Sequence, residues 1–504
     1  MNRPTTIALG CVLLLALALR LYGIHNPILD HPGWRQGDGA AIARNFATLQ
    51  NDIFYPQTDY DGPPPNYVQL ELQVVPFAAA QLYRAFGVHE IFLRILVIAF
   101  SLGTIPLVYA LGAQLYSPRA GLLAALLYAV SPGPVYYGRA VIPESVMLFF
   151  CAGALLCWWR FCSERRAIFI VLACLLAAMA ALAKPPGLII LVPMLAIAVW
   201  KQRARALADP ANYALVIVVL VPLWLYLTHL GAIAEWHWAS GITSKHVLPA
   251  LAAALHSPGA ALRAFGGMLA LQRMLATTIL GPALFTLLLL AAIAQPRDPS
   301  GGLRSVFFGS WFVTLAAYAF VVVNVERVDY YLMPFALFAV LYAAGSLDWV
   351  LERVGVGTPS VWTCVALGSG LFFVTYSNML EIHPYYTWSR NVYAAATEVR
   401  DTIEPGTLIV MGHDDPAVLY TIAHRGWEED PLLWNVHDMT SAIGKGARYF
   451  VAVEVPRFAA NRPLYAFMQR YRRVPVRSGW QVYDMHHFAL QAKADLKVRR
   501  YTRG

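Results

Sequence analysis

The sequence predicts a polytopic α-helical membrane protein with a small C-terminal α/β domain, and three observations support this fold class. The chain has 504 residues, of which 58% are hydrophobic. Its charged fraction is 13%, whereas soluble domains carry about 25%. Apolar runs recur along residues 1–380, and shorter strand-like and helical patterns follow in 381–504. This composition excludes a soluble enzyme, a coiled coil and a disordered scaffold.

About eleven uncharged runs are expected to cross the membrane, because lipid offers exposed backbone groups no hydrogen-bond partner. Counting every ambiguous segment, the upper bound is thirteen. The expected spans lie at about residues 4–24, 94–115, 120–137, 145–161, 167–183, 186–200, 211–228, 276–295, 305–324, 330–347 and 360–380.

Loop charge predicts the orientation. The net charge of +9 is concentrated in alternate short loops, such as those holding Arg165 and Arg166 or Lys201 and Arg203. The positive-inside rule places these loops and the N-terminus in the cytoplasm, so the C-terminal domain lies outside. Two further segments, 25–93 and 229–275, are then expected on the outer side.

Residues 67–86 leave two alternatives open, a further span or a helix along the outer interface. The segment is apolar, but Glu71 and Arg84 would each be costly in lipid. We favour the interfacial helix, which also preserves the alternation of loop charge.

The C-terminal part is expected to form a small α/β domain. Segments 407–412, 449–455 and 480–485 have strand patterns, and 387–403 and 416–424 have helical patterns. The polar triplet at 413–415 (HDD) is interpreted as a set of polar surface residues, because it has no metal-ligand spacing. The basic stretch at the end of the chain is interpreted as a frayed terminus.

The first candidate motif is DHPGWRQGDGAAIARNF (30–46), which follows the first span. Asp38 lies among small residues, so a bulky substrate could reach its carboxylate, and Arg35 is close to it in sequence. The alternative is that Asp38 merely caps the helix that begins near Gly39.

Further charged residues fall in the other predicted outer segments. Asp61 and Glu71 flank a triple proline, and Arg139 and Glu144 lie in the short loop YYGRAVIPES. Ordinary explanations are a solvated turn for the first pair, and a snorkelling arginine with a helix cap for the second. The functional explanation for Arg139 is that it binds an anionic headgroup.

Lys184 interrupts a nearly continuous apolar run, so it needs a partner or an aqueous cavity. The segment VERVDYYLMP adds Arg327, Tyr330 and Tyr331, with pairing between Arg327 and Asp329 as the ordinary explanation. There is no glycine-rich phosphate loop and no GxSxG motif in the sequence. Carboxylates and isolated cations on one side of the membrane therefore indicate chemistry on a lipid-carried, phosphate-linked substrate.

The sequence resembles the polyprenyl-phosphate-dependent glycosyltransferases of the GT-C superfamily, in the branch of protein O-mannosyltransferases and the lipid A aminoarabinose transferase. The resemblance covers nearly the whole chain. It rests on WRQGDGAAIARNF, the pattern of 61–71, LYRAFGVHEIFLR, SPRAGLLAALLYAVSPGPVYYGRAVIPESVMLFF, ALAKPPGLIIL, DYYLMP and AVLYTIAHRGW.

The resemblance implies roles for these residues. Asp38 matches the family's essential aspartate and would be the general base. Arg139, Lys184 and Arg327 would bind the donor phosphate, in falling order of expectation. We expect further substrate contacts from Arg35, Asp61, Glu71, Glu144, Tyr330 and Tyr331. Gly39 stands where many relatives have glutamate, so contacts to the acceptor can differ from theirs.

Glu144 matches an acidic position that helps to bind a divalent metal in oligosaccharyltransferases. It is the one acidic residue of that loop, as in relatives that look metal-independent. We therefore assign no metal site and no cofactor, and keep a divalent metal as the alternative.

The expected function is that of an inverting glycosyltransferase in the bacterial inner membrane, with its C-terminal domain in the periplasm. It would move a hexose or pentose from polyprenyl (undecaprenyl) phosphate to lipid A, another envelope glycan such as lipopolysaccharide, or a protein. Membrane lipids are its other partners, and nucleic acid is not expected. The alternative is a transporter or flippase of lipid-linked sugar, which should show mid-membrane charges and two related halves.

Overall fold

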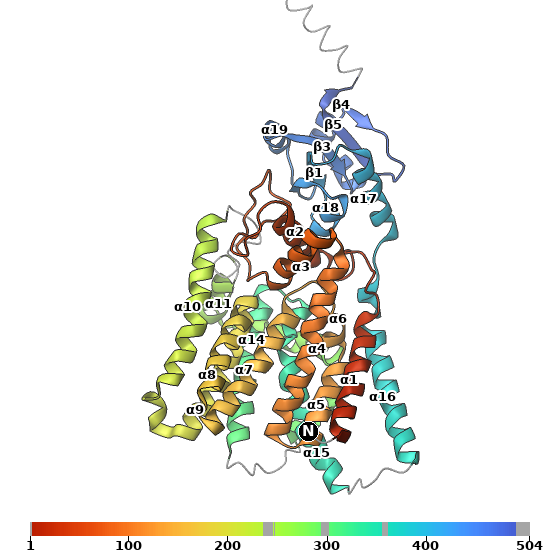
Figure 1. Ribbon diagram of the computed structural model, residues 1–504. Coiled ribbons are helices and arrows are strands. Elements are labelled where there is room, and N and C mark those ends of the chain that lie inside the picture. Colours follow the sequence, from red (N-terminus) through yellow and green to blue (C-terminus); the bar gives the residue numbers. More distant parts are fainter. Residues whose placement is uncertain (1–2, 235–244, 246, 294–301, 355–360, 490–504) are drawn as a thin grey trace, which may run out of the picture.

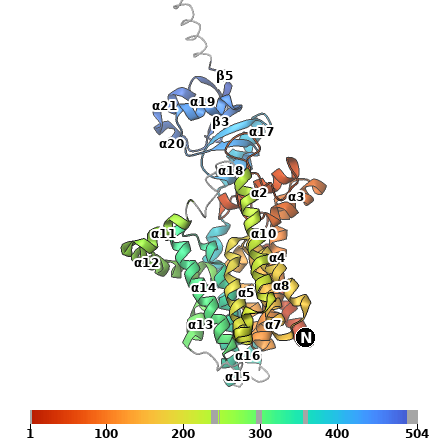
Figure 2. The same ribbon diagram turned by 90° about the vertical axis from the view of Figure 1, so that its left-hand side faces the viewer.

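The computed structural model describes residues 3–234, 245, 247–293, 302–354 and 361–489. It shows a tall bundle of helices with a small α/β domain at one end (Figures 1 and 2). Between the two lie a pair of short helices, α2 (Gly33–Thr48) and α3 (Val74–Phe86). The fold class predicted from the sequence, a polytopic helical membrane protein with a C-terminal α/β domain, is confirmed.

The described part of the bundle holds eight helices that are long and apolar enough to cross a membrane, and three shorter apolar helices. Each of the eleven predicted spans overlaps one of them. The helices of the bundle are α1 (Arg3–Leu21), α4 (Glu90–Leu115), α5 (Pro118–Val130), α6 (Pro132–Tyr136), α7 (Glu144–Glu164), α8 (Ala167–Ala183), η1 (Pro185–Ile190), α9 (Leu191–Gln202), η2 (Arg203–Leu207), α10 (Pro210–Ile233), α11 (Leu248–His256), α12 (Pro258–Met274), η4 (Leu275–Ile279), α13 (Pro282–Ile293), α14 (Leu303–Val325), η5 (Asp329–Leu332), α15 (Pro334–Arg353), α16 (Val361–Ile382) and η6 (His383–Tyr386).

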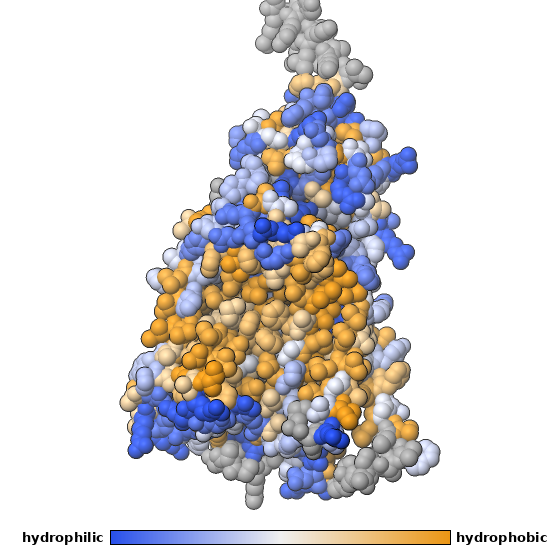
Figure 3. All heavy atoms as spheres, viewed as in Figure 1, coloured by the Kyte–Doolittle hydropathy of each residue, from blue (hydrophilic) through white to orange (hydrophobic). Residues whose placement is uncertain are grey.

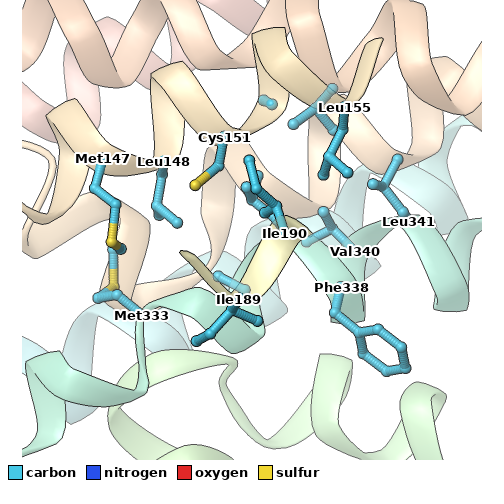
Figure 4. Packing of buried hydrophobic residues seen from close by; sticks show 14 of the residues in the cluster. Met147, Leu148, Cys151, Leu155, Ile189, Ile190, Met333, Phe338, Val340 and Leu341 are labelled. Atoms are coloured by element: carbon cyan, nitrogen blue, oxygen red, sulfur yellow. The ribbon is translucent and has the colours of Figure 1, made fainter. Parts of the chain in front are cut away.

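The outside of the bundle carries a broad apolar band between two polar ends (Figure 3). Inside, side chains of α7 pack against those of η1 and α15 and form part of one continuous core (Figure 4). The labelled members of this core are Met147, Leu148, Cys151, Leu155, Ile189, Ile190, Met333, Phe338, Val340 and Leu341. An apolar exterior around a packed core is the arrangement expected of a bundle in lipid.

The N-terminal helix begins at the end of the bundle opposite to the α/β domain (Figure 1). This placement agrees with an odd number of spans. The assignment of the α/β domain to the outer side of the membrane stays a prediction.

Residues 67–86 do not form a continuous helix. Helix α3 begins at Val74, has 13 residues and is too short to be a candidate span. It packs against α2 and α4 at the domain end of the bundle. Much of segment 229–275 is α11 and α12, and residues 235–244 and 246 lie outside the described residues.

The C-terminal domain is built on a five-stranded sheet with strand order β2-β1-β3-β5-β4. Strands β1, β2 and β3 run parallel, and β5 joins β3 and β4 in antiparallel pairs. Its elements are α17 (Arg390–Thr402), β1 (Leu408–Gly412), α18 (Pro416–Ile422), β2 (Arg425–Glu428), α19 (Val436–Gly444), β3 (Ala447–Ala452), α20 (Val455–Ala460), α21 (Arg462–Met468), β4 (Tyr471–Val474) and β5 (Gln481–Phe488).

The expected strands correspond to β1, β3 and β5, and the expected helices to α17 and α18. Strands β2 and β4 were not expected, because RGWE and YRRV are short and lack the alternating apolar pattern. The basic stretch at the end of the chain lies outside the described residues.

The segment between α1 and α4 is joined tightly to the C-terminal domain. The Gly62 amide donates to the Gly426 carbonyl at 2.7 Å, and the Gly426 amide donates to the Asp59 carbonyl at 2.8 Å. The Tyr60 side chain packs in the hydrophobic core of the domain. Helix α2 also approaches α18 so closely that a Cβ on Gly37 would lie 2.5 Å from the Ala417 backbone nitrogen.

A buried ion network ties the loop after α1 to the bundle. The Asp30 carboxylate accepts hydrogen bonds from Arg139 and Arg94, and all three side chains are fully buried. Burial alone would raise the pKa of Asp30, but the two guanidinium groups lower it overall. Arg139 also lies 4.6 Å from the Tyr386 ring centroid. These contacts give the buried Arg139 a structural role, whereas the sequence analysis expected it to bind an anionic headgroup.

Substitution of Arg139 by methionine is expected to destabilise the whole protein, because Asp30 would lose one of its two buried cations. Breaking a buried ion pair costs roughly 3–5 kcal/mol. Thermal unfolding of the full-length chain in detergent, followed by intrinsic fluorescence, measures the loss. Arg166→Met is the control, since Arg166 is exposed. Normal stability of Arg139→Met with weakened donor binding would restore the role predicted from the sequence.

The contact between α2 and α18 predicts that Gly37→Ala is also destabilising. The added methyl group would meet backbone atoms that cannot rotate away, and such overpacking costs about 1–3 kcal/mol. Gly444→Ala is the matched control, because a Cβ at Gly444 meets no atom within 4 Å. Equal unfolding temperatures for the two variants would contradict the predicted close contact.

Candidate functional site

Asp38 lies inside α2, at the boundary between the bundle and the C-terminal domain. The helix begins at Gly33 with Pro32 as its N-cap, so the alternative that Asp38 caps the helix is wrong. The residue is 2% exposed. It follows Gly37, where α18 makes its closest approach. The carboxylate is therefore held on a rigid element and enclosed from two sides.

Two side chains contact the Asp38 carboxylate. Arg35, one turn earlier on α2, places Nη1 at 3.7 Å from Asp38 Oδ2. The Tyr60 hydroxyl forms a side-chain hydrogen bond with Asp38. Among the described residues, Asp38 Oδ1 has no hydrogen-bond partner, although it is buried. A buried, unpaired carboxylate oxygen is poised to accept a proton or a hydrogen bond from a ligand.

The environment of Asp38 suits a base that works near neutral pH. Burial raises the pKa of Asp38 to about 7, and the negative charges of Glu71 and Asp415 contribute to the rise. Arg35 and the Tyr60 hydroxyl act in the opposite direction. A base is most effective when its pKa is close to the working pH.

Arg35 and Glu71 lie beside Asp38. The Arg35 guanidinium donates to Glu71 Oε1. Burial disfavours the charged form of Arg35, but the neighbouring carboxylates of Glu71 and Asp38 raise its pKa overall. Arg35 therefore stays a cation next to the base. The Arg35 guanidinium has five N–H donors, so some of them stay available after it has bound the Glu71 and Asp38 carboxylates.

Lys184 forms a second cationic centre near Arg35. It lies where α8 ends, donates to Glu144 Oε1, and has its Nζ 4.7 Å from the Tyr331 ring centroid and 5.0 Å from that of Tyr330. Arg35 interacts electrostatically with Lys184 and with both tyrosines. Residues predicted from four separate segments are thus brought together around Arg35 and Lys184, which we call the cation pair.

Asp329 holds Tyr137 and Tyr385 in place. It accepts hydrogen bonds from the hydroxyl groups of Tyr137, at 2.6 Å, and Tyr385. Its Oδ1 lies 3.5 Å from His31 Nε2. These contacts take the place of the expected pairing between Asp329 and Arg327.

Two further predicted site residues, Arg327 and Asp61, make other contacts. Arg327 is exposed, donates to the Val323 carbonyl at 3.4 Å and lies beside Gly267 of α12. Asp61 has a φ of 73° and interacts electrostatically with Tyr60, on the side of the C-terminal domain.

Three residues near Asp38 were missed as site candidates in the sequence. They are Tyr60, Asp415 and Glu428, and the last two come from the C-terminal domain. The HDD triplet was expected to consist of polar residues on the protein surface. Instead, Asp415 caps α18 and interacts electrostatically with Asp38. The available signal was its position directly after β1, because loops at the carboxyl ends of parallel strands often bind ligands.

The residues do not fit a divalent metal. Glu144, the acidic residue that the resemblance places in a metal-binding loop, is paired with the Lys184 ammonium group. Within the described ranges, no group of three or more His, Cys, Asp or Glu side chains could hold a metal ion. No step of the chemistry below is assigned to one.

A large apolar cavity of about 740 Å³ lies within the helical bundle. Its walls come from α12, α13, α14 and α15, with Leu332 of η5 directly after Tyr331. The walls include Leu271, Leu275, Phe285, Leu288, Phe308, Phe312, Phe335 and Phe338. Such a cavity is suited to a long hydrocarbon chain.

Comparison with known proteins identifies the fold. Residues 73–227 match the family model described as dolichyl-phosphate-mannose-protein mannosyltransferase. No protein among curated sequences matches the chain.

Solved structures match over almost the whole length. The crystal structure of ArnT from Cupriavidus metallidurans bound to undecaprenyl phosphate has a TM-score of 0.59 at 15% identity, covering 94% of this chain and 97% of that one. The oligosaccharyltransferase AglB from Archaeoglobus fulgidus, in complex with an inhibitory peptide and a dolichol-phosphate, has a TM-score of 0.57 at 14% identity, covering 97% and 75%. The resemblance noted in the sequence is therefore confirmed: this multi-pass membrane protein shares the fold of ArnT and AglB, and its residues 73–227 match the mannosyltransferase family model.

Proposed function

We propose that the protein is an inverting glycosyltransferase that moves a sugar from a polyprenyl phosphate carrier to an acceptor hydroxyl. The observation that carries the proposal is a buried carboxylate beside a cation pair, in a protein whose bundle also holds a large apolar cavity. The mannosyltransferase family match supports a lipid-linked sugar transferase. So does the shared fold with ArnT and AglB, whose structures hold undecaprenyl phosphate and dolichol-phosphate. The location would be the bacterial inner membrane, with Asp38 on the periplasmic side.

The donor phosphate would bind at the cation pair. Arg35 and Lys184 each contact a carboxylate and keep further N–H donors for phosphate oxygens. Tyr330 and Tyr331 bring two aromatic rings to the same place. The polyprenyl chain would then lie in the apolar cavity. In this proposal the phosphate-binding role expected of Arg139 passes to Arg35, and the role expected of Arg327 stays a prediction.

Transfer would occur in one displacement. The acceptor oxygen attacks the anomeric carbon, its proton passes to Asp38 Oδ1, and the bond from the anomeric carbon to the phosphate oxygen breaks. The electron pair leaves with polyprenyl phosphate, whose growing negative charge is stabilised by Arg35 and Lys184. Because attack and departure occur on opposite faces, the sugar configuration inverts. Arg35 therefore acts on both the departing phosphate and the base, because it also orients Asp38.

Substitution Asp38→Asn is expected to abolish transfer, because an amide cannot accept the proton. General-base catalysis contributes about 10²–10⁴-fold to a rate. Wild-type transfer should increase as pH rises through about 7, where Asp38 loses its proton, and should level off above it. Arg35→Gln should shift this increase to higher pH, because the lost cation stabilises the carboxylate.

Labelled sugar transferred from synthetic polyprenyl-phosphate donors to envelope extracts measures these rates, and mass spectrometry of envelope glycans tests the same variants in cells. Equal rates for wild type and Asp38→Asn would contradict the assignment of the base. Transbilayer movement of donor without transfer would favour the transporter alternative.

Filling the apolar cavity should weaken binding of long-chain carriers selectively. Gly309 of α14 lines the cavity, and a Cβ there meets no atom within 4 Å. Gly309→Phe is expected to weaken undecaprenyl phosphate binding by about tenfold or more. Binding of geranyl phosphate, whose chain is short, should change little. Gly370→Phe on α16 is the matched control, since Gly370 also has open space around it. Equal losses for both phosphates would contradict the proposed path of the chain.

A further inference from the structure

We propose that the C-terminal domain builds the acceptor subsite, and that this subsite selects an uncharged glycan hydroxyl over a phosphate-bearing acceptor. The inference rests on the proposed function, because it names the acceptor class for the same base. It is argued from the residues that surround Asp38 on the side facing away from the membrane.

The two sides of Asp38 carry opposite charge. Toward the bundle lie Arg35, at 3.7 Å, and Lys184 beyond it. Toward the C-terminal domain, Asp38 interacts electrostatically with the carboxyl groups of Asp415 and Glu428. Asp61 of the preceding loop interacts with Glu428 from the same side. A donor phosphate therefore has a place on one side of the base, and an anionic acceptor would meet carboxylates on the other.

Both domain residues come from the carboxyl ends of parallel strands. Strand β1 ends at Gly412, and Asp415 follows as the N-cap of α18, with Oδ1 accepting from the Ala417 amide at 2.9 Å. Strand β2 ends at Glu428, which pairs in register with Met411. In open α/β sheets, ligands bind at this edge. The sheet thus presents its usual binding edge to the base.

Buried oxygen atoms without partners point to a ligand at this place. Asp38 Oδ1 and Glu428 Oε2 are both buried, and neither has a hydrogen-bond partner in the described part of the chain. Leaving such atoms unpaired is unfavourable, so a ligand with hydroxyl donors would satisfy them. A sugar carries neighbouring hydroxyl groups and can supply two donors, whereas a serine or threonine side chain supplies one.

Protonation agrees with a hydroxyl ligand. Burial raises the pKa of Glu428 well above its usual range, and the charges of Asp38 and Asp415 raise it further. This shift favours the protonated form of Glu428, which can donate to one sugar oxygen and accept from another. Hydroxyl groups both donate and accept, and a phosphate dianion only accepts.

The nearby cations do not offset this acidity. His413 contacts Asp414 at 3.1 Å. Arg457 is bound to Asp430 and lies 2.9 Å from Glu454. Each is already paired with a carboxylate, so neither is available to attract an anionic acceptor.

The test compares three acceptors with one polyprenyl-phosphate donor and the full-length protein. The acceptors are a neutral oligosaccharide, the same oligosaccharide carrying a phosphate monoester, and a serine/threonine peptide. Transfer and binding to protein preloaded with undecaprenyl phosphate are both measured. We expect the neutral oligosaccharide to be preferred by tenfold or more in transfer efficiency and in affinity. Preference for the phosphorylated sugar or the peptide, or binding of none of the three, would overturn the inference.

The variant Glu428→Gln keeps the shape of the side chain and removes its acid group. It should raise the acceptor KM by tenfold or more, while the donor KM and the affinity for undecaprenyl phosphate stay unchanged. Asp415→Asn, which retains an oxygen for the α18 cap, should act in the same direction. Glu404→Gln is the matched control, because Glu404 lies before β1, at the opposite end of the strands, and pairs with Arg448.

An unchanged acceptor KM in Glu428→Gln would overturn the inference. Failure of the proposed function gives a different result, in which wild-type protein neither transfers sugar nor binds undecaprenyl phosphate. Transfer to a phosphorylated acceptor would leave the proposed function intact and reject the acceptor class alone.

Discussion

The close packing of α2 against α18 is the contact on which the site depends. Gly37 allows the two helices to touch, and the next residue, Asp38, is thereby enclosed at 2% exposure. Desolvation of that carboxylate brings its pKa to about 7, into the range where it can exchange a proton at neutral pH. Because α18 belongs to the C-terminal domain, that domain is part of the chemical environment of the base.

The site is asymmetric in charge and in polarity. On the membrane side lie Arg35 and Lys184, and the bundle below them holds an apolar cavity whose lining includes Leu332. On the domain side, carboxyl groups gather at the carboxyl ends of β1 and β2. In the proposed function, such an arrangement would give a lipid phosphate and an uncharged acceptor separate places on either side of Asp38. The Asp30–Arg94–Arg139 network stabilises the site around Asp38, because it fixes the loop that leads into α2.

Local patterns in the sequence predicted the spans, because each span is encoded by one contiguous apolar run. They also singled out Asp38, Arg35, Glu71, Lys184 and the two tyrosines, which the fold gathers at the boundary. Pairings between distant segments were beyond such reasoning. Arg139 is neutralised by Asp30, 109 residues away, so its buried position had no local signal. Asp415 and Glu428 reach Asp38 from more than 370 residues along the chain, and Glu428 lies on strand β2, which is too short and polar to recognise.

The most direct test of the account is an experimental structure of the full-length protein with undecaprenyl phosphate bound. The account predicts phosphate oxygens within hydrogen-bond distance of Arg35 and Lys184, and the polyprenyl chain between α12, α14 and α15. Asp38 Oδ1 should face the space next to the phosphate. A phosphate bound at Arg327, or at the opposite end of the bundle near Arg304, would contradict the central claim that the cation pair and Asp38 form one active site.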